Sequence, residues 1–151
     1  AKENLEFFGT LHNLSSRQIK ERISRLSSLL EIDDLDKPFQ NYSTGMKHRL
    51  GLARCLLNEP EIIFMDEPTR SLDPSSAHAF RIFIKERLAK ELGKTVFFTT
   101  HQTKEAQDIA DKIIIMNKGA LTASGTLSEI NLRYGLTPGA PLEEAYLKIT
   151  L

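Results

Sequence analysis

The chain has 151 residues, 40% of them hydrophobic and 26% charged, which fits a folded domain with a sizeable core and excludes a disordered chain. Twenty lysines and arginines balance twenty aspartates and glutamates, so a protein that binds nucleic acid through an overall basic charge is disfavoured. The single cysteine, Cys55, excludes an internal disulfide bond, and no apolar run approaches the ~20 residues that span a bilayer. The chain begins with Ala1 rather than Met, and no apolar run follows its charged first residues. We therefore expect a piece of a longer protein, without a signal peptide.

The first 58 residues predict a helical subdomain. Residues 1–40 have the pattern of a helix, a turn and a second helix that begins near Ser15. Apolar residues three and four positions apart mark one face of that second helix: Ile19, Ile23, Leu26, Leu29 and Leu30. Residues 43–58 form a further helix by the same criterion, with Met46, Leu50, Ala53 and Leu57 on one face. We expect residues 1–58 to fold as a subdomain that ends with this helix.

Strands and helices alternate over residues 59–151, which predicts an α/β fold with a parallel sheet flanked by helices. The expected strands lie at 62–65, 95–99 and 112–117, with helices at 76–92 and 103–110 between them. A hairpin partner at 120–124 and helices around 127–134 and 142–149 complete the chain. Because the strands are short uninterrupted apolar runs, we expect them to be covered on both faces.

Two carboxylates, Asp66 and Glu67, directly follow the first predicted strand. Ligands of open α/β sheets gather at the carboxyl ends of the strands. Asp66 is the kind of hard oxygen ligand that holds Mg²⁺, and Glu67 could act on a water as a general base. For the dipeptide alone, an acidic pair that merely opens an exposed turn is an equally good interpretation.

The segment Tyr42–Met46 comes at the start of a predicted helix. Ser43 is a suitable N-cap, and Gly45 would let a phosphate approach the backbone amides and the positive end of the helix dipole. Because serine capping is common, an ordinary capped helix is the simpler interpretation of this segment by itself.

Two further residues stand near the same predicted sheet edge. His101 follows the second predicted strand and could contact a terminal phosphate at the edge that carries Asp66 and Glu67. A surface histidine that caps the next helix is an equal alternative. Asp73 comes shortly after the acidic pair, in Ser71–Pro74, and by itself indicates only a turn.

Together, in this order and spacing, the four segments resemble the motifs of the ATP-binding cassette (ABC) ATPase family. Residues 42–46 are similar to the signature motif, 62–67 to Walker B with its catalytic glutamate, 71–73 to the D-loop, and His101 to the switch histidine. Two departures fall in the signature, where Thr44 replaces the first of two usual glycines and Met46 stands where glutamine is common.

The flanking segments refine this resemblance. Residues 4–8 and 142–147 are similar to the ATPase subunits of multidrug, antibiotic or polysaccharide exporters. The resemblance implies a P-loop NTPase-like fold, with residues 59–151 as the C-terminal part of the α/β ATPase core. It also implies coupling of ATP hydrolysis to export, at a cytoplasmic site peripheral to the inner face of the cell membrane.

The same resemblance assigns cofactors, partners and residue roles. The cofactors are ATP and Mg²⁺, and the partners are transmembrane permease subunits and a second nucleotide-binding subunit in a head-to-tail dimer, with no nucleic acid. Asp66 would be the metal ligand, and Glu67 and His101 the catalytic residues. The nucleotide-contacting and interface residues would be Ser43, Thr44, Gly45 and Asp73.

The P-loop that such an ATPase needs, G-x-x-x-x-G-K-[ST], does not occur in the chain. The one Gly-Lys-Thr, at 93–95, has Leu88 where the pattern needs its first glycine, and it leads from a helix into a strand rather than the reverse. We therefore expect the chain to correspond to the C-terminal portion of the ATPase and to be inactive alone. We also expect an uncovered strand edge that favours self-association.

Three other interpretations remain at this point. One is a non-catalytic remnant that docks on an intact ABC subunit. Another is an ABC protein that acts on DNA or ribosomes, although the chain has neither a long coiled-coil insertion nor a basic arm. A Ser-His-Asp hydrolase is disfavoured because no G-x-S-x-G segment is present.

Overall fold

The computed structural model describes residues 1–151 and divides into two compact units. The first unit comprises Ala1–Ile63 with Ser71–Ser76, and the second comprises Phe64–Arg70 with Ala77–Leu151. No helix in either unit combines the length and the apolar character needed to cross a membrane.

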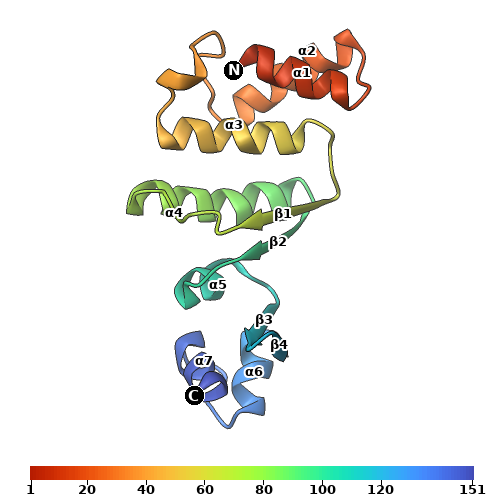
Figure 1. The fold of residues 1–151 in the computed structure, drawn as a ribbon. Coiled ribbons are helices and arrows are strands. Elements are labelled where there is room, and N and C mark those ends of the chain that lie inside the picture. The colour runs from red at the N-terminus through yellow and green to blue at the C-terminus, as the bar shows by residue number, and fades with distance from the viewer. The chain divides into compact units, whose positions relative to one another are not determined.

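Helices dominate the first unit (Figure 1). Its elements are α1 (Lys2–Leu11), α2 (Ser16–Leu29), the short 3-10 helix η1 (Phe39–Asn41) and α3 (Thr44–Leu56). The predicted helices are confirmed, and Ser15 caps α2 in a reciprocal capping box with Gln18. Helices α1 and α2 approach closely at Gly9, where an added Cβ would lie 2.7 Å from Cγ1 of Ile19. Leu5 is fully buried in this unit.

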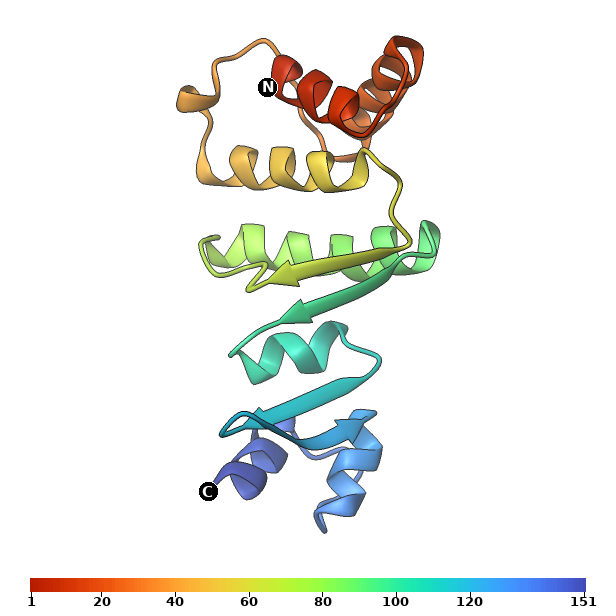
Figure 2. The ribbon, with the colours of Figure 1, turned by 45° about the vertical axis from the view of Figure 1, so that its right-hand side comes forward.

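The second unit contains a small sheet of two strands, β1 (Ile62–Asp66, which begins in the first unit) and β2 (Thr95–Thr99). Their arrows point the same way in Figure 2. The backbone N–H of Glu67 donates to the carbonyl of Thr99 at 3.1 Å. The carboxyl ends of both strands therefore meet at one edge.

The helical segment between these strands differs from the predicted single α-helix. Helix α4 (Pro74–Ile82) continues into η2 (Phe83–Glu91), a π-helix with wider turns. At its end, the N–H of Leu92 bonds to the carbonyl of Arg87, five residues back, at 2.9 Å. The segment η2 packs against β2 and buries Leu88 completely.

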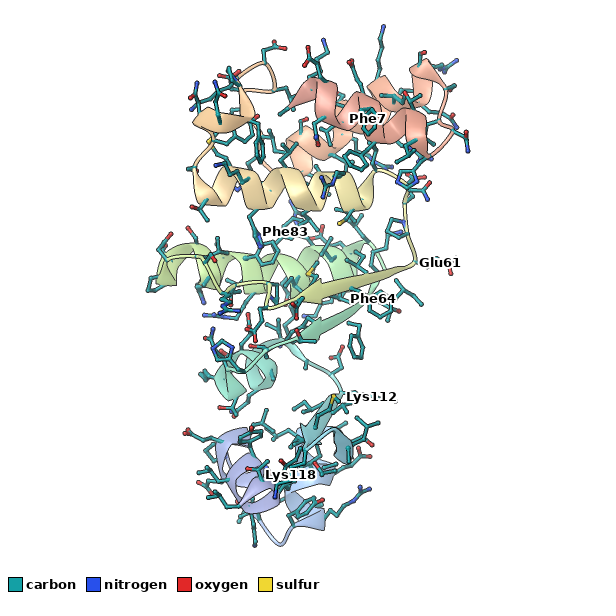
Figure 3. All side chains as sticks on the ribbon, in the orientation of Figure 1. Phe7, Glu61, Phe64, Phe83, Lys112 and Lys118 are labelled. Atoms are coloured by element: carbon teal, nitrogen blue, oxygen red, sulfur yellow. The ribbon has the colours of Figure 1, made fainter.

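The prediction that the strands are covered on both faces is wrong. Along β1 the burial alternates, with Ile63 4% exposed and Phe64 74% exposed (Figure 3). Phe97 of β2 is also exposed, and its ring centroid lies 5.6 Å from that of Phe64. The face of the sheet on which these two rings lie is therefore open.

The third predicted strand belongs to a different sheet, which corrects the expectation of one parallel sheet. Strand β3 (Ile113–Asn117) pairs antiparallel with β4 (Ala120–Gly125), and the predicted hairpin is thereby confirmed. Both residues of its two-residue turn have positive φ, 50° at Lys118 and 78° at Gly119, the conformation of a type I′ turn.

The hairpin forms its own core with the C-terminal helices α5 (Thr103–Ile109), α6 (Leu127–Arg133) and α7 (Leu142–Thr150). The buried residues of this core are Ile113, Ile115, Ala123, Ile130, Leu142 and Ala145. The opposite face of β3 is open, because Ile114 is 48% exposed and Met116 62%. Strand β3 therefore has the alternating burial of an antiparallel sheet with one covered face.

Candidate functional site

The carboxyl ends of β1 and β2 bring three of the predicted site residues together in the second unit. Asp66 is the last residue of β1, Glu67 follows it, and His101 stands two residues after the end of β2. Nδ1 of His101 lies 2.8 Å from Oε1 of Glu67. Since a carboxylate can only accept, Nδ1 carries a proton and donates it to this bond, in which Nε2 takes no part.

Thr99 links the two strand ends and was not among the residues that the sequence indicated. Its hydroxyl donates to Oδ1 of Asp66 and accepts from the backbone N–H of Glu67 at 3.3 Å. A hydroxyl can do both because it has one proton and two lone pairs. The available sequence signal was a hydroxyl residue at the last position of a strand that ends beside the acidic pair.

The environment of Glu67 is unusual in its backbone conformation and in its hydrogen bonding. Its backbone has a φ of 47°, an uncommon conformation for a residue other than glycine. Its Oε2 atom is buried and has no hydrogen-bond partner within the chain. A buried carboxylate oxygen without a partner calls for a bound donor, such as a water or a ligand.

The same residues fit a magnesium nucleotide in part. Asp66 and Glu67 supply carboxylate oxygens, the ligand type that Mg²⁺ prefers. No group of three or more potential metal-ligating side chains occurs in the structure. Mg²⁺ is commonly bound by one or two carboxylates together with phosphate oxygens and water.

The segment that resembles the signature lies in the first unit and is built by local contacts. Oγ of Ser43 accepts from the N–H of Met46 at 3.2 Å and caps α3. Tyr42, 4% exposed, anchors the preceding residues by donating its hydroxyl to the carbonyl of Asp34 at 2.6 Å. Its burial, together with the charges of Asp34 and Asp36, raises the pKa of Tyr42.

Thr44 and Gly45 form the first turn of α3 and have open space around them. Thr44 is exposed, and an added Cβ at Gly45 would meet no atom within 4 Å. The packing of the chain itself therefore does not require glycine at this position. An absent side chain here matters only to a group that approaches from outside.

Asp73, also in the first unit, has a structural task. Its Oδ1 accepts from the N–H groups of Ser75 and Ser76, both at 3.0 Å, and its Oδ2 accepts from the Ser76 hydroxyl at 2.6 Å. These bonds, the one from the Ser76 hydroxyl foremost, lower the pKa of Asp73. Asp73 therefore caps the start of α4, which supports the local interpretation of the turn.

Two cavities of the first unit contain none of the predicted site residues. One, of about 310 Å³, is lined by Gln18, Glu21, Arg22, Arg25 and Glu59. The other, of about 330 Å³, is lined by Phe8, His12, Arg54, Cys55, Asn58 and Pro60. The predicted site residues lie instead at strand ends, at a helix start and in a turn, where Asp66, Asp73 and His101 are exposed and Glu67 is partly buried.

The chain is similar in sequence to several known proteins. The ABC transporter family model matches residues 1–70. The ABC transporter ATP-binding protein NatA of Bacillus subtilis is 37% identical over 131 residues, which cover 86% of the chain and 52% of NatA. The daunorubicin resistance ATP-binding protein DrrA3 of Streptomyces coeruleorubidus is 37% identical over 89% of the chain and 42% of DrrA3. The Nod factor export ATP-binding protein I of Cupriavidus metallidurans is 38% identical over 85% of the chain and 42% of that protein.

A solved structure, described as the ATP-binding subunit of an ABC transporter, matches with a TM-score of 0.81 at 28% identity, over 98% of the chain and 61% of that structure. The predicted fold class, α/β of the P-loop NTPase type, is confirmed by this match. The chain belongs to the ABC transporter ATP-binding protein family. It spans between 42% and 52% of the three relatives named above.

Proposed function

We propose that the chain forms part of the ATP-hydrolysing subunit of an ABC exporter. The observation that carries this proposal is the Glu67–His101 pair, 2.8 Å apart, with a buried and unpartnered Oε2 on Glu67. A base oriented by a second group, with one oxygen left for a water, is the arrangement that general-base catalysis needs. The names of the relatives DrrA3 and Nod factor export protein I support export rather than import.

Each residue of the cluster then has a distinct task. Asp66 holds the magnesium ion, which when bound neutralises charge on the phosphates. Glu67 accepts a proton from water at Oε2, and His101 keeps Glu67 in place through Nδ1–H. In its doubly protonated form, His101 also donates from Nε2–H to an oxygen of a terminal phosphate. Phosphoryl transfer depends mainly on such positioning and charge neutralisation.

The segment Ser43–Gly45 serves a second subunit in this proposal. In a head-to-tail dimer, Ser43, Thr44 and Gly45 contact the γ-phosphate of the nucleotide held by the partner, and Asp73 lies at the dimer interface. The open space around Gly45 and the free amides at the start of α3 suit a phosphate. The permease subunits that carry the substrate would hold the assembly at the inner face of the membrane.

The test is ATP hydrolysis in a hybrid that supplies the phosphate cradle. A P-loop segment from a relative such as NatA is fused ahead of Ala1, and phosphate release from Mg-ATP is measured. Glu67→Gln should lower the rate by about 10²- to 10⁴-fold, the usual contribution of a general base. Glu61→Gln, the same change at an exposed glutamate before the start of β1, is the matched control and should leave the rate unchanged.

The 151-residue chain alone should bind fluorescent Mg-ATP poorly and hydrolyse almost none, because it has no lysine-bearing phosphate cradle. It should also self-associate in light scattering, because Phe64 and Phe97 are exposed on one face of the small sheet. Turnover by the chain alone that disappears in Glu67→Gln would overturn the need for a P-loop. A folded hybrid that hydrolyses ATP equally well with Glu67→Gln would overturn the role of Glu67.

A further inference from the structure

A buried hydrogen bond joins the turn after β1 to helix α5. The hydroxyl of Thr69 donates to Oε1 of Glu105 at 2.7 Å. Thr69 is 4% exposed and Glu105 is 1% exposed. Both residues lie in the second unit, and they are 36 positions apart in the sequence. No feature of the sequence had drawn attention to either of them.

The cost of this arrangement argues against a purely stabilising role. Burying a carboxylate is unfavourable unless its oxygens are hydrogen-bonded. Oε2 of Glu105 is buried without any partner in the chain, so only one of its two oxygens is satisfied. A leucine or alanine would pack at such a position without leaving a polar atom unpaired. We therefore attribute the presence of a glutamate at position 105 to its hydrogen bond with Thr69.

Thr69 and Glu105 each lie a few residues after one member of the Glu67–His101 pair. Thr69 follows Glu67 by two residues, and Glu105, in the first turn of α5, follows His101 by four. The Glu67–His101 bond and the Thr69–Glu105 bond therefore connect the same two segments, one at the surface and one in the interior. The inner bond fixes the first turn of α5 against the turn after β1.

The outer pair needs this support because it is exposed. The side chain of His101 is 66% exposed and that of Glu67 is 22% exposed. Exposed pairs of this kind contribute little to holding two segments together. Two other hydrogen bonds join α5 to segments other than the turn after β1. Gln107 accepts from the N–H of Leu142 at 2.9 Å, and the carbonyl of Asp108 accepts from Lys85 at 2.8 Å.

We propose that Glu105 is a positioning residue, which acts through Thr69 to hold His101 against Glu67. Its importance for hydrolysis rests on the proposed function above, whereas the positioning itself is a property of this chain. Removing the inner bond lets the first turn of α5 shift, so that Nδ1 of His101 loses its carboxylate partner.

The tautomer of His101 reports this contact without any nucleotide. In the wild-type chain, the bond to Glu67 favours the form protonated at Nδ1. A histidine released from such a bond prefers protonation at Nε2. Two-bond ¹H–¹⁵N spectra of the neutral imidazole distinguish the two forms, and Glu67→Ala provides the spectrum of released His101. His12, in the first unit, serves as the internal reference.

The decisive variants are Thr69→Val, which removes the donor at nearly constant volume, and Thr69→Ser, which keeps it. We expect Thr69→Val to move His101 to the spectrum seen in Glu67→Ala, and Thr69→Ser to retain the wild-type spectrum. Glu105→Leu should act as Thr69→Val does, and the Thr69 pair decides the matter if that variant does not fold. Circular dichroism shows whether each variant is folded.

An unchanged His101 spectrum in a folded Thr69→Val chain would overturn the proposal. So would an equal change in Thr69→Ser and Thr69→Val, since that would mean that packing rather than the hydroxyl matters. Either result would leave the hydrolysis test of Glu67→Gln in the hybrid unaffected, so the two proposals fail separately.

Discussion

The segment around Ser43 and the cluster around Glu67 are built in opposite ways. The Ser43 cap joins residues three positions apart, whereas the Glu67–His101 pair joins residues 34 positions apart. The first forms wherever helix α3 forms. The second forms only when β1 and β2 pair, because their paired carboxyl ends place the two side chains at one edge. A local site and a long-range site in one chain should therefore respond differently to the same kind of perturbation.

The largest expected effect on the Glu67–His101 site comes from a cavity in the core that packs against β2. Leu88 is fully buried in η2, which packs against β2. Leu88→Ala should lower the free energy of unfolding by about 2–5 kcal/mol, through lost burial and the cavity left behind. Urea unfolding followed by the His78 and His101 resonances of the second unit measures this. Leu92→Ala, at a leucine that is 43% exposed, should cost less than about 1 kcal/mol, and equal losses would contradict the assigned core.

The local site is broken by removing its cap. Ser43→Ala should destabilise the first unit by about 1 kcal/mol, because the N–H of Met46 loses its acceptor. Ser43→Asp, which restores an acceptor, should recover most of the loss. Urea unfolding followed by the ring resonances of Tyr42 tests both variants. A Ser43→Ala chain as stable as the wild type would show that the cap contributes nothing.

Gly45 sharpens the comparison because a substitution there should affect ATP hydrolysis without lowering the stability of the chain. Gly45→Ala should leave the chain unchanged or more stable by roughly 0.5–1 kcal/mol, since the new Cβ meets nothing and alanine favours a helix. In the hybrid, the same change should reduce ATP hydrolysis, because the phosphate of the partner subunit would meet the added methyl group. A loss of stability together with activity would instead indicate a structural glycine.

The smallest effect is a pH dependence at Asp73. Hydrogen bonds from Ser76 and Ser75 lower its pKa in the folded chain. The carboxylate therefore stabilises the start of α4 above the pKa of an unfolded aspartate, and this contribution is lost as the pH falls through the lower folded value. Carboxyl ¹³C shifts give the folded pKa directly. Ser76→Ala should move it back toward the ordinary aspartate value, and an unchanged pKa would contradict the assigned bonds.

Local features were predictable from the sequence because their causes lie within a few residues. The caps at Ser15 and Ser43 each need only a hydroxyl three residues before a backbone N–H. The β3–β4 hairpin needs only two apolar runs around Lys118–Gly119, where both residues can adopt positive φ. The placement of Glu67 and His101 at one edge also followed, since each stands within two residues of the end of a predicted strand.

The tertiary structure decided what depends on distant parts of the chain. Burial of Ile63 but not Phe64 depends on which segments lie over each face of β1, and an uninterrupted apolar run contains no information on that. The assignment of β3 to its own sheet depends on the core that it shares with α6 and α7. Glutamate is a residue type that is usually exposed, yet Glu105 is buried and hydrogen-bonded to Thr69, 36 positions earlier in the chain. The sequence determines the elements and their order, whereas packing selects which faces are covered and which polar groups are buried.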